Sequence, residues 1–144
     1  MARSSSKPAV KALPKAEKSA KPARVPPRAG VRNIVEEPWQ QFPGHFGSAL
    51  SKPLVRPENL GSRLIDYRIS TYQPMAHVQL HAHKVQEQVY HVLEGEGLME
   101  IGGERRIVRK HDVIFLPPGV PHKITNEGLG DLTFIVVTTP PEDE

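Results

Sequence analysis

The stretch that decides the fold reads Leu64-Ile65-Asp66-Tyr67-Arg68-Ile69-Ser70-Thr71-Tyr72. Apolar and polar residues alternate along most of it, which is the period of a strand with one buried face. The pattern stops at Pro74, because proline has no N–H to donate to a neighbouring strand. Further short stretches of the same kind follow, and they cover residues 77–83, 88–93, 98–101, 105–109, 113–116, 123–126 and 132–138.

Glycines separate these stretches, and no segment after residue 61 has a clean helical period. Gly102-Gly103 lies between two predicted strands, and a glycine pair is a typical two-residue hairpin turn. About eight short strands with glycine turns predict an all-β fold, a closed sandwich or small barrel over residues 63–140. A barrel of that size has room for one small-ligand site.

Length and composition exclude several classes of protein. A chain of 144 residues without cysteine predicts one folded domain, with no disulfide framework and no cysteine nucleophile. The longest apolar runs, such as residues 134–137, are far shorter than the roughly 20 residues that cross a bilayer. We therefore expect no membrane span, and we expect a cytoplasmic protein because no hydrophobic leader follows Met1.

The net charge of +3 combines a basic first segment with an acidic remainder. Residues 1–32 carry nine Lys or Arg and one acid, a formal charge of +8, which leaves −5 on the rest. This segment has almost nothing large and apolar to bury, so we expect a disordered basic tail. It could tether the protein to nucleic acid or an anionic surface, or be a solubilising extension, a wrongly assigned start or a targeting peptide. We expect no nucleic-acid binding by the folded body.

Residues 33–62 predict an irregular arm that packs on the barrel or across a dimer partner. Four prolines interrupt any long helix in it: Pro38, Pro43, Pro53 and Pro57. Large apolar residues nevertheless give it surface to bury: Trp39, Phe42, Phe46, Leu50 and Leu54. His45 lies in this arm and could cap the mouth of the barrel.

Three histidines are concentrated in residues 77–83. Alternate residues of a strand face the same side, so His77, Gln79, His81 and His83 are expected to form one row. Imidazole nitrogens with this spacing can bind one metal ion together. An exposed strand face is the alternative, and the row alone leaves both interpretations open.

The residues around this row resemble the two motifs of the cupin superfamily. The first motif is carried by His81-x-His83, Glu87-Gln88 and Gly95, and the second by Pro117-x-Gly119-x-x-His122-x-x-x-Asn126. The resemblance covers about residues 64–138. The sequence is similar to small cupins described as mannose-6-phosphate isomerase-like. It implies a double-stranded β-helix, or jelly-roll, barrel that forms a homodimer. It also implies that His81, His83 and His122 bind one divalent transition metal ion, which would be Zn, Fe, Ni or Mn.

The resemblance leaves two candidates for a fourth metal ligand. The family's ligand usually stands seven positions before the glycine that ends the strand, and counting back from Gly95 reaches Gln88. Only one of two neighbouring strand residues can face inward, so Glu87 is the alternative. We favour Gln88, because Tyr90 and Val92 would then line the cavity with it. A neutral amide ligand leaves the ion's charge less compensated, which favours anionic substrates.

Two residues depart from the family pattern, and four others are candidates for the pocket. Met75 and His111 stand where the motifs usually have glycine, so both are expected at turns.

His77 shares the predicted face of the metal ligands and could move a proton, and Tyr90 could present a hydroxyl. Arg68 and Tyr72 share a strand face and could bind a carboxylate or phosphate. The alternatives are a surface histidine, a core tyrosine and an ordinary salt bridge; His91, on the opposite face, is expected to pack or form an interface.

Three functions are compatible with such a site. The first is an isomerase or lyase whose divalent metal acts as a Lewis acid on a small oxygen-rich substrate, sugar-like or carboxylate. The second is an iron- or nickel-dependent dioxygenase, which would use the same ligands. The third is a non-catalytic module that binds or senses a small molecule and needs the basic tail for its output. The fold alone does not choose among them.

Overall fold

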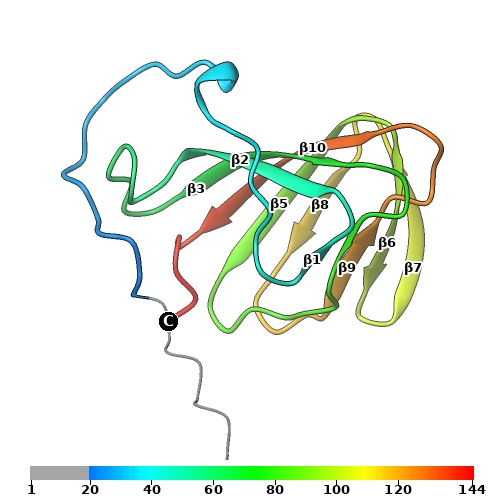
Figure 1. The fold of residues 1–144 in the computed structure, drawn as a ribbon. Coiled ribbons are helices and arrows are strands. Elements are labelled where there is room, and N and C mark those ends of the chain that lie inside the picture. The colour runs from blue at the N-terminus through cyan, green and yellow to red at the C-terminus, as the bar shows by residue number, and fades with distance from the viewer. Residues whose placement is uncertain (1–19) are drawn as a thin grey trace, which may run out of the picture.

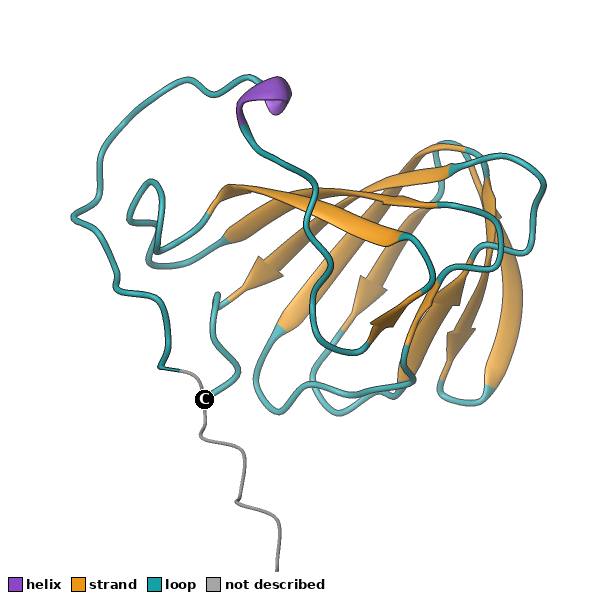
Figure 2. Cartoon of the chain, in the orientation of Figure 1, coloured by secondary structure: helices purple, strands orange, loops and turns teal. Residues whose placement is uncertain are grey.

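The fold is built from strands, with one short 3-10 turn, Ile34–Glu36 (η1), in the part of the chain that is described (Figure 2). A computed structural model describes residues 20–144, so residues 1–19 of the predicted basic tail lie outside the described residues. Within residues 20–144, no helix is long and apolar enough to span a membrane. These observations confirm the all-β prediction.

Two five-stranded antiparallel sheets form the barrel (Figure 1). One sheet has the order β2 (Ala49–Val55), β3 (Asp66–Tyr72), β10 (Leu132–Thr139), β5 (Glu87–Glu94) and β8 (Val113–Leu116). The other has the order β1 (His45–Phe46), β4 (His77–Val78), β9 (His122–Thr125), β6 (Glu96–Ile101) and β7 (Glu104–Arg109). Neighbours in each sheet are mostly distant in sequence, which is the topology of the predicted jelly roll.

The inner faces of the two sheets supply one hydrophobic core. Along β10 every second residue is buried, so Leu132, Phe134, Val136 and Thr138 face inward. Side chains from other strands complete the core: Val92, Met99, Leu116 and Ile124 are each at most 1% exposed. Burial of these apolar side chains supplies most of the favourable free energy of folding. Most of the buried polar side chains among the described residues line the cavity described below, and Asn126, which bonds to the Tyr72 and Gly130 carbonyls, is an exception.

Seven of the eight predicted strands are present, with boundaries within about two residues of the prediction. The Gly102-Gly103 hairpin is also confirmed, because both glycines have positive φ, +57° and +86°, between the paired residues Ile101 and Glu104. The predicted strand at residues 77–83 is wrong beyond Val78. Its neighbour β1 is only two residues long, so the ladder ends there and strand alternation no longer decides where the following side chains face.

The arm is more regular than the sequence suggested. Residues 49–55 form β2, which pairs with β3 and joins the barrel wall, so the expectation of an irregular arm is wrong there. Small residues point inward along β2, since Ala49 and Ser51 are buried. Pro53 is tolerated because β2 is an edge strand, where a missing N–H breaks no ladder hydrogen bond.

Residues 20–32 contain no regular secondary structure, yet the chain packs there on the segment that follows β2. The Val25 N–H donates to the Pro57 carbonyl over 2.9 Å, and the Arg28 N–H donates to the Leu60 carbonyl over 3.0 Å. Such backbone pairing is not what we expected of a disordered tail. The Arg32 side chain continues the contact by donating to the Leu54 carbonyl and pairing with Glu37.

The two turn residues that replace the family's glycines adopt the conformation that glycine would favour. Met75 has φ of +72° and His111 has φ of +76°, and these are the two residues other than glycine with positive φ among those described. The left-handed region costs a side-chain-bearing residue roughly 1–2 kcal/mol. Both turns are nevertheless fixed by backbone hydrogen bonds, such as the one from the His111 N–H to the Val92 carbonyl.

Replacement of His111 by glycine should therefore stabilise the protein. We expect His111→Gly to raise the free energy of unfolding by about 1 kcal/mol, after allowance for glycine's larger chain entropy, and Tm by about 3 °C. Thermal unfolding followed by circular dichroism measures this. Gly95→Ala is the opposite control, because φ at Gly95 is +80° and a Cβ there would overlap the Asp131 carbonyl oxygen. If His111→Gly lowered Tm instead, the inference that His111 is strained at this turn would be wrong.

Candidate metal centre

Three histidines converge at one end of the barrel, from three positions in the chain. His122 begins β9, and His81 forms an isolated bridge with it, with backbone N–O distances of 3.1 and 2.8 Å. His83 follows two residues later. One ring nitrogen from each histidine lies within 4.8 Å of the others, which is close enough for all three to bind one metal ion.

Backbone carbonyls set the orientation of two of these rings. The Nδ1 of His122 lies 2.9 Å from the Val120 carbonyl oxygen, and that of His81 lies 2.7 Å from the Gln79 carbonyl oxygen. A carbonyl can only accept, so each Nδ1 carries the proton. The other nitrogen of each neutral ring, Nε2, then offers its lone pair, which is how ligating histidines are usually oriented.

Gln88 places an oxygen among these nitrogens. Its Oε1 lies 3.2 Å from Nε2 of His83 and 3.2 Å from Nε2 of His122. Its Nε2 donates to the Thr138 hydroxyl over 3.0 Å, and its Oε1 also accepts from the Tyr90 hydroxyl over 3.3 Å. Glu87, the alternative, is exposed on the outer face of β5.

Burial favours the neutral form of His81 and His122. It lowers the pKa of His122 to about 4, with a further contribution from the neighbouring His81 and His83. Burial also lowers the pKa of His81, although its hydrogen bond to the Gln79 carbonyl partly opposes the shift. These two rings and the Gln88 amide therefore present uncharged nitrogen and oxygen ligand atoms, which suit a divalent transition metal.

A second observation indicates that these ligand atoms suit a metal ion. The unprotonated Nε2 of His122 and the Oε1 of Gln88 are both acceptors, yet they face each other across 3.2 Å. Two lone pairs at that distance repel each other unless a proton or a cation lies between them. The Val120 carbonyl already holds the ring's proton on the other side, so a cation is the natural partner for both.

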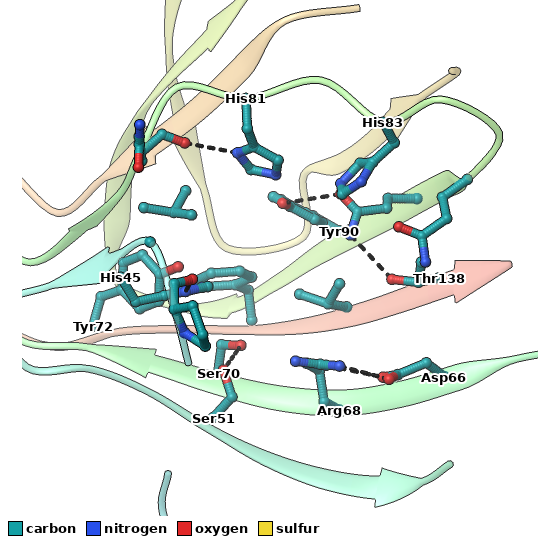
Figure 3. A pocket seen from close by; sticks show the side chains of 18 of the residues that line it. His45, Ser51, Asp66, Arg68, Ser70, Tyr72, His81, His83, Tyr90 and Thr138 are labelled. Atoms are coloured by element: carbon teal, nitrogen blue, oxygen red, sulfur yellow. Dashed lines mark hydrogen bonds and ion pairs between the residues drawn. The ribbon is translucent and has the colours of Figure 1, made fainter. Parts of the chain in front are cut away.

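A cavity of about 340 Å³ opens in front of these residues. Figure 3 shows His81 and His83 on one side of it and Arg68 and Asp66, both from β3, on the other. The Arg68 guanidinium donates to both carboxylate oxygens of Asp66, over 2.9 and 2.5 Å. Asp66 also pairs with Arg56 at 3.0 Å, so one carboxylate is shared between two cations. Asp66 is the only acidic residue among the described residues that line the cavity.

The structure brings most of the predicted pocket residues together. Arg68, Tyr72 and Tyr90 line the cavity, as does His45 from the arm. Burial raises the pKa of both tyrosines, so their hydroxyls stay protonated and act as hydrogen-bond donors. His45 is also kept neutral, because burial lowers its pKa.

The structure does not place His77 in the pocket. Its ring stacks on Phe46, with ring centroids 5.3 Å apart, and it is the next residue, Val78, that lines the cavity. The prediction assumed that His77 and His81 share a strand face. Because β4 ends at Val78, strand alternation no longer relates the two side chains, and His81 lines the cavity whereas His77 does not.

Two residues of this region were not among those predicted from the sequence. Thr138 holds the Gln88 amide, and the alternation along β10 from Leu132 could have identified it as inward-facing. Asp143 lies 3.6 Å from Nδ1 of His83. No local pattern marks it, because it follows the last strand and meets His83 only through the fold.

Comparison with known proteins agrees with this geometry. Residues 68–138 match the family model described as cupin domain. An uncharacterised protein from Methanocaldococcus jannaschii is 44% identical over 62 residues, which are 43% of this chain and 50% of that protein. An oxalate-binding protein from Thermotoga maritima is 36% identical over 64 residues, 44% of this chain and 53% of that protein. The matched stretch thus spans about half the length of these curated relatives.

Among solved structures, a predicted oxalate decarboxylase from Thermotoga maritima superposes with a TM-score of 0.70 at 26% identity. The superposition covers 76% of this chain and 98% of that one, so it includes both sheets of the barrel and not only the motif region. The strand order, the histidine cluster and the family match lead to the same assignment. This chain carries a cupin domain and belongs to the cupin superfamily.

Proposed function

We propose that this cupin domain binds one divalent transition metal ion through His81, His83, His122 and Gln88, and acts on a small carboxylate. The observation that carries the proposal is the cluster of facing acceptors, in which Gln88 Oε1 lies 3.2 Å from a ring nitrogen of both His83 and His122. Three imidazoles and one amide oxygen are a donor set that fits zinc, iron, nickel or manganese.

The charges around the cavity favour an anionic ligand. All four proposed ligands are neutral, so the full charge of a divalent ion would remain uncompensated by them. Across the cavity, Arg68 offers a guanidinium with further N–H donors. Its partner Asp66 also pairs with Arg56, which pairs in turn with Glu58, so these four side chains balance in charge. A carboxylate suits both ends, because it can bind a metal ion and accept paired hydrogen bonds from a guanidinium.

The relatives support a carboxylate rather than a sugar-like substrate. One curated relative is named an oxalate-binding protein, and one solved structure is described as a predicted oxalate decarboxylase. Both likenesses are above 25% identity. A cavity of about 340 Å³ with polar residues on two walls has room for a dicarboxylate as small as oxalate.

The residues of the cavity have distinct roles in such a reaction. A bound divalent ion would supply Lewis-acid polarisation of a carboxylate or carbonyl oxygen. Arg68 orients the anion, and Tyr90 holds the Gln88 oxygen in place. His45 takes the role that we first considered for His77, because its ring lines the cavity and its Nδ1 lies 3.1 Å from the Pro43 carbonyl oxygen. That contact leaves its Nε2 unprotonated and able to accept a proton.

Elemental analysis of the purified protein tests the metal centre. We expect near-stoichiometric metal in the wild type, and a loss in His81→Ala and Gln88→Ala that exceeds the ~10–100-fold drop in affinity typical of residues outside the ligand set. Glu87→Ala is the matched control, since Glu87 is the exposed neighbour of Gln88 on β5. If the wild type stays metal-free after reconstitution, or if Glu87→Ala loses metal and Gln88→Ala keeps it, the proposed centre is wrong. Iron in the wild type would lead to oxygen-consumption assays for the dioxygenase alternative.

Isothermal titration of the metal-loaded protein with oxalate tests the substrate class. We expect Arg68→Gln to weaken oxalate binding roughly 10- to 100-fold, because a hydrogen bond to a charged group contributes about 1.5–3 kcal/mol. Arg105→Gln is the control, as Arg105 is exposed on β7 and pairs only with Glu100 among the described residues. Equal binding by both variants would exclude Arg68 from the substrate site. Carbon-13 NMR of labelled oxalate and related carboxylates then separates an enzyme, which forms product, from a binding module, which does not.

A further inference from the structure

The last residues of the chain return to the rim of the barrel beside the candidate metal centre. After β10 ends at Thr139, the chain continues through Pro140 and Pro141, and Pro141 lines the cavity. The Asp143 carboxylate then accepts hydrogen bonds from three consecutive backbone N–H groups, those of Lys84, Val85 and Gln86, over 2.9, 2.8 and 3.3 Å. A carboxylate that accepts several backbone N–H groups is a strong, directional anchor.

The anchored loop is the connection between two proposed metal ligands. Residues 84–86 follow His83 directly and lead into β5, which carries Gln88. Among the described residues, no other acceptor is found for the three N–H groups. The position of the loop, and with it the spacing between His83 and Gln88, therefore depends on a residue about 60 positions away in the sequence.

Asp143 also faces the back of the His83 ring. Its Oδ2 lies 3.6 Å from Nδ1, whereas Nε2 on the other side of the ring lies 3.2 Å from Gln88 Oε1. A carboxylate on that side favours the proton on Nδ1 and leaves the Nε2 lone pair toward the site. It corresponds to the carbonyls behind His81 and His122, so each of the three rings has an acceptor on the side away from the cluster.

Further contacts hold the C-terminal segment, residues 140–144, in this position. The Gln86 side chain donates to the Pro140 carbonyl over 3.0 Å. On the other side, Arg24 pairs with Glu142 at 2.7 Å, and Lys21 pairs with Glu144. Figure 1 shows the C-terminus next to the start of the described chain. These outer ion pairs are exposed and individually weak, so Asp143 is the main attachment.

We infer that Asp143 is a positioning residue of the metal centre, which anchors the loop between His83 and Gln88 and directs Nε2 of His83 toward the ion. The inference rests on the proposed metal centre. It assigns a role to the C-terminal segment, which neither cupin motif contains. Asp143 acts through His83 and the loop and is not itself a metal ligand.

The test compares Asp143→Ala and Asp143→Asn with the matched control Glu142→Gln. Glu142 is the adjacent acid, and it contacts Arg24 rather than the loop. Cobalt(II) serves as the probe, because its visible spectrum reports the geometry of its ligands, and competition with a chromophoric chelator measures its affinity. We expect Asp143→Ala to lower cobalt affinity about 10- to 100-fold and to change the spectrum, with a smaller loss in Asp143→Asn, which retains one acceptor oxygen. Glu142→Gln should bind cobalt as the wild type does.

Amide hydrogen exchange in the metal-free protein provides a second, independent readout. In Asp143→Ala the N–H groups of residues 84–86 should exchange about 10-fold faster or more, because each loses an acceptor with a full charge. Faster exchange together with wild-type cobalt affinity and spectrum would mean that Asp143 only supports the loop, and would overturn the positioning role. A wild type that binds no cobalt would instead overturn the proposed centre itself. Thermal unfolding of each variant confirms that the fold is retained.

Discussion

The site depends on the register of three neighbouring strands, β3, β10 and β5. In this register Thr138 of β10 lies opposite Asp66 on one side and opposite Gln88 on the other. Two residues earlier on β10, Val136 lies opposite Arg68 on one side and opposite Tyr90 on the other. Because strand residues alternate between faces, a slip of one residue in either pairing would turn the whole set outward. The Gln88 amide also hydrogen-bonds to the Thr138 hydroxyl across this pairing.

The same register explains how charge is tolerated inside the barrel. Asp66 is only 1% exposed, and an unpaired carboxylate at that depth would be strongly destabilising. Arg68, two residues along the same strand face, and Arg56 share this carboxylate. Arg68 therefore lies on one wall of the cavity, and the proposed metal ligands lie on the other. Arg56 pairs in turn with Glu58, so the four side chains balance in charge and Arg68 still has N–H groups to offer a ligand.

How much of this could be predicted from the sequence varies with the physical origin of each feature. Strand alternation reports burial, so it located β3, β5 and β10, and together with the family's spacing to Gly95 it favoured Gln88 over Glu87 as the inward residue. The spacing of His81, His83 and His122 was recognisable because the motif is a local pattern in two short segments. Alternation misplaced His77, since it holds only inside a ladder and the ladder of β4 ends at Val78. Asp143 has no local signal, because its role comes from chain segments that meet only in the folded protein.

The proline that concealed β2 in the sequence has a consequence for the protein in solution. β2 is the outer strand of its sheet, and an open strand edge can recruit another chain. The Ser51 N–H, which points away from β3, is already bonded to the Gln40 carbonyl over 2.8 Å. Two residues further along, the same edge reaches Pro53, which has no N–H to offer. Gln40 of the arm and Pro53 thus leave this edge few free N–H groups, which protects it from the addition of a strand from another chain and from aggregation.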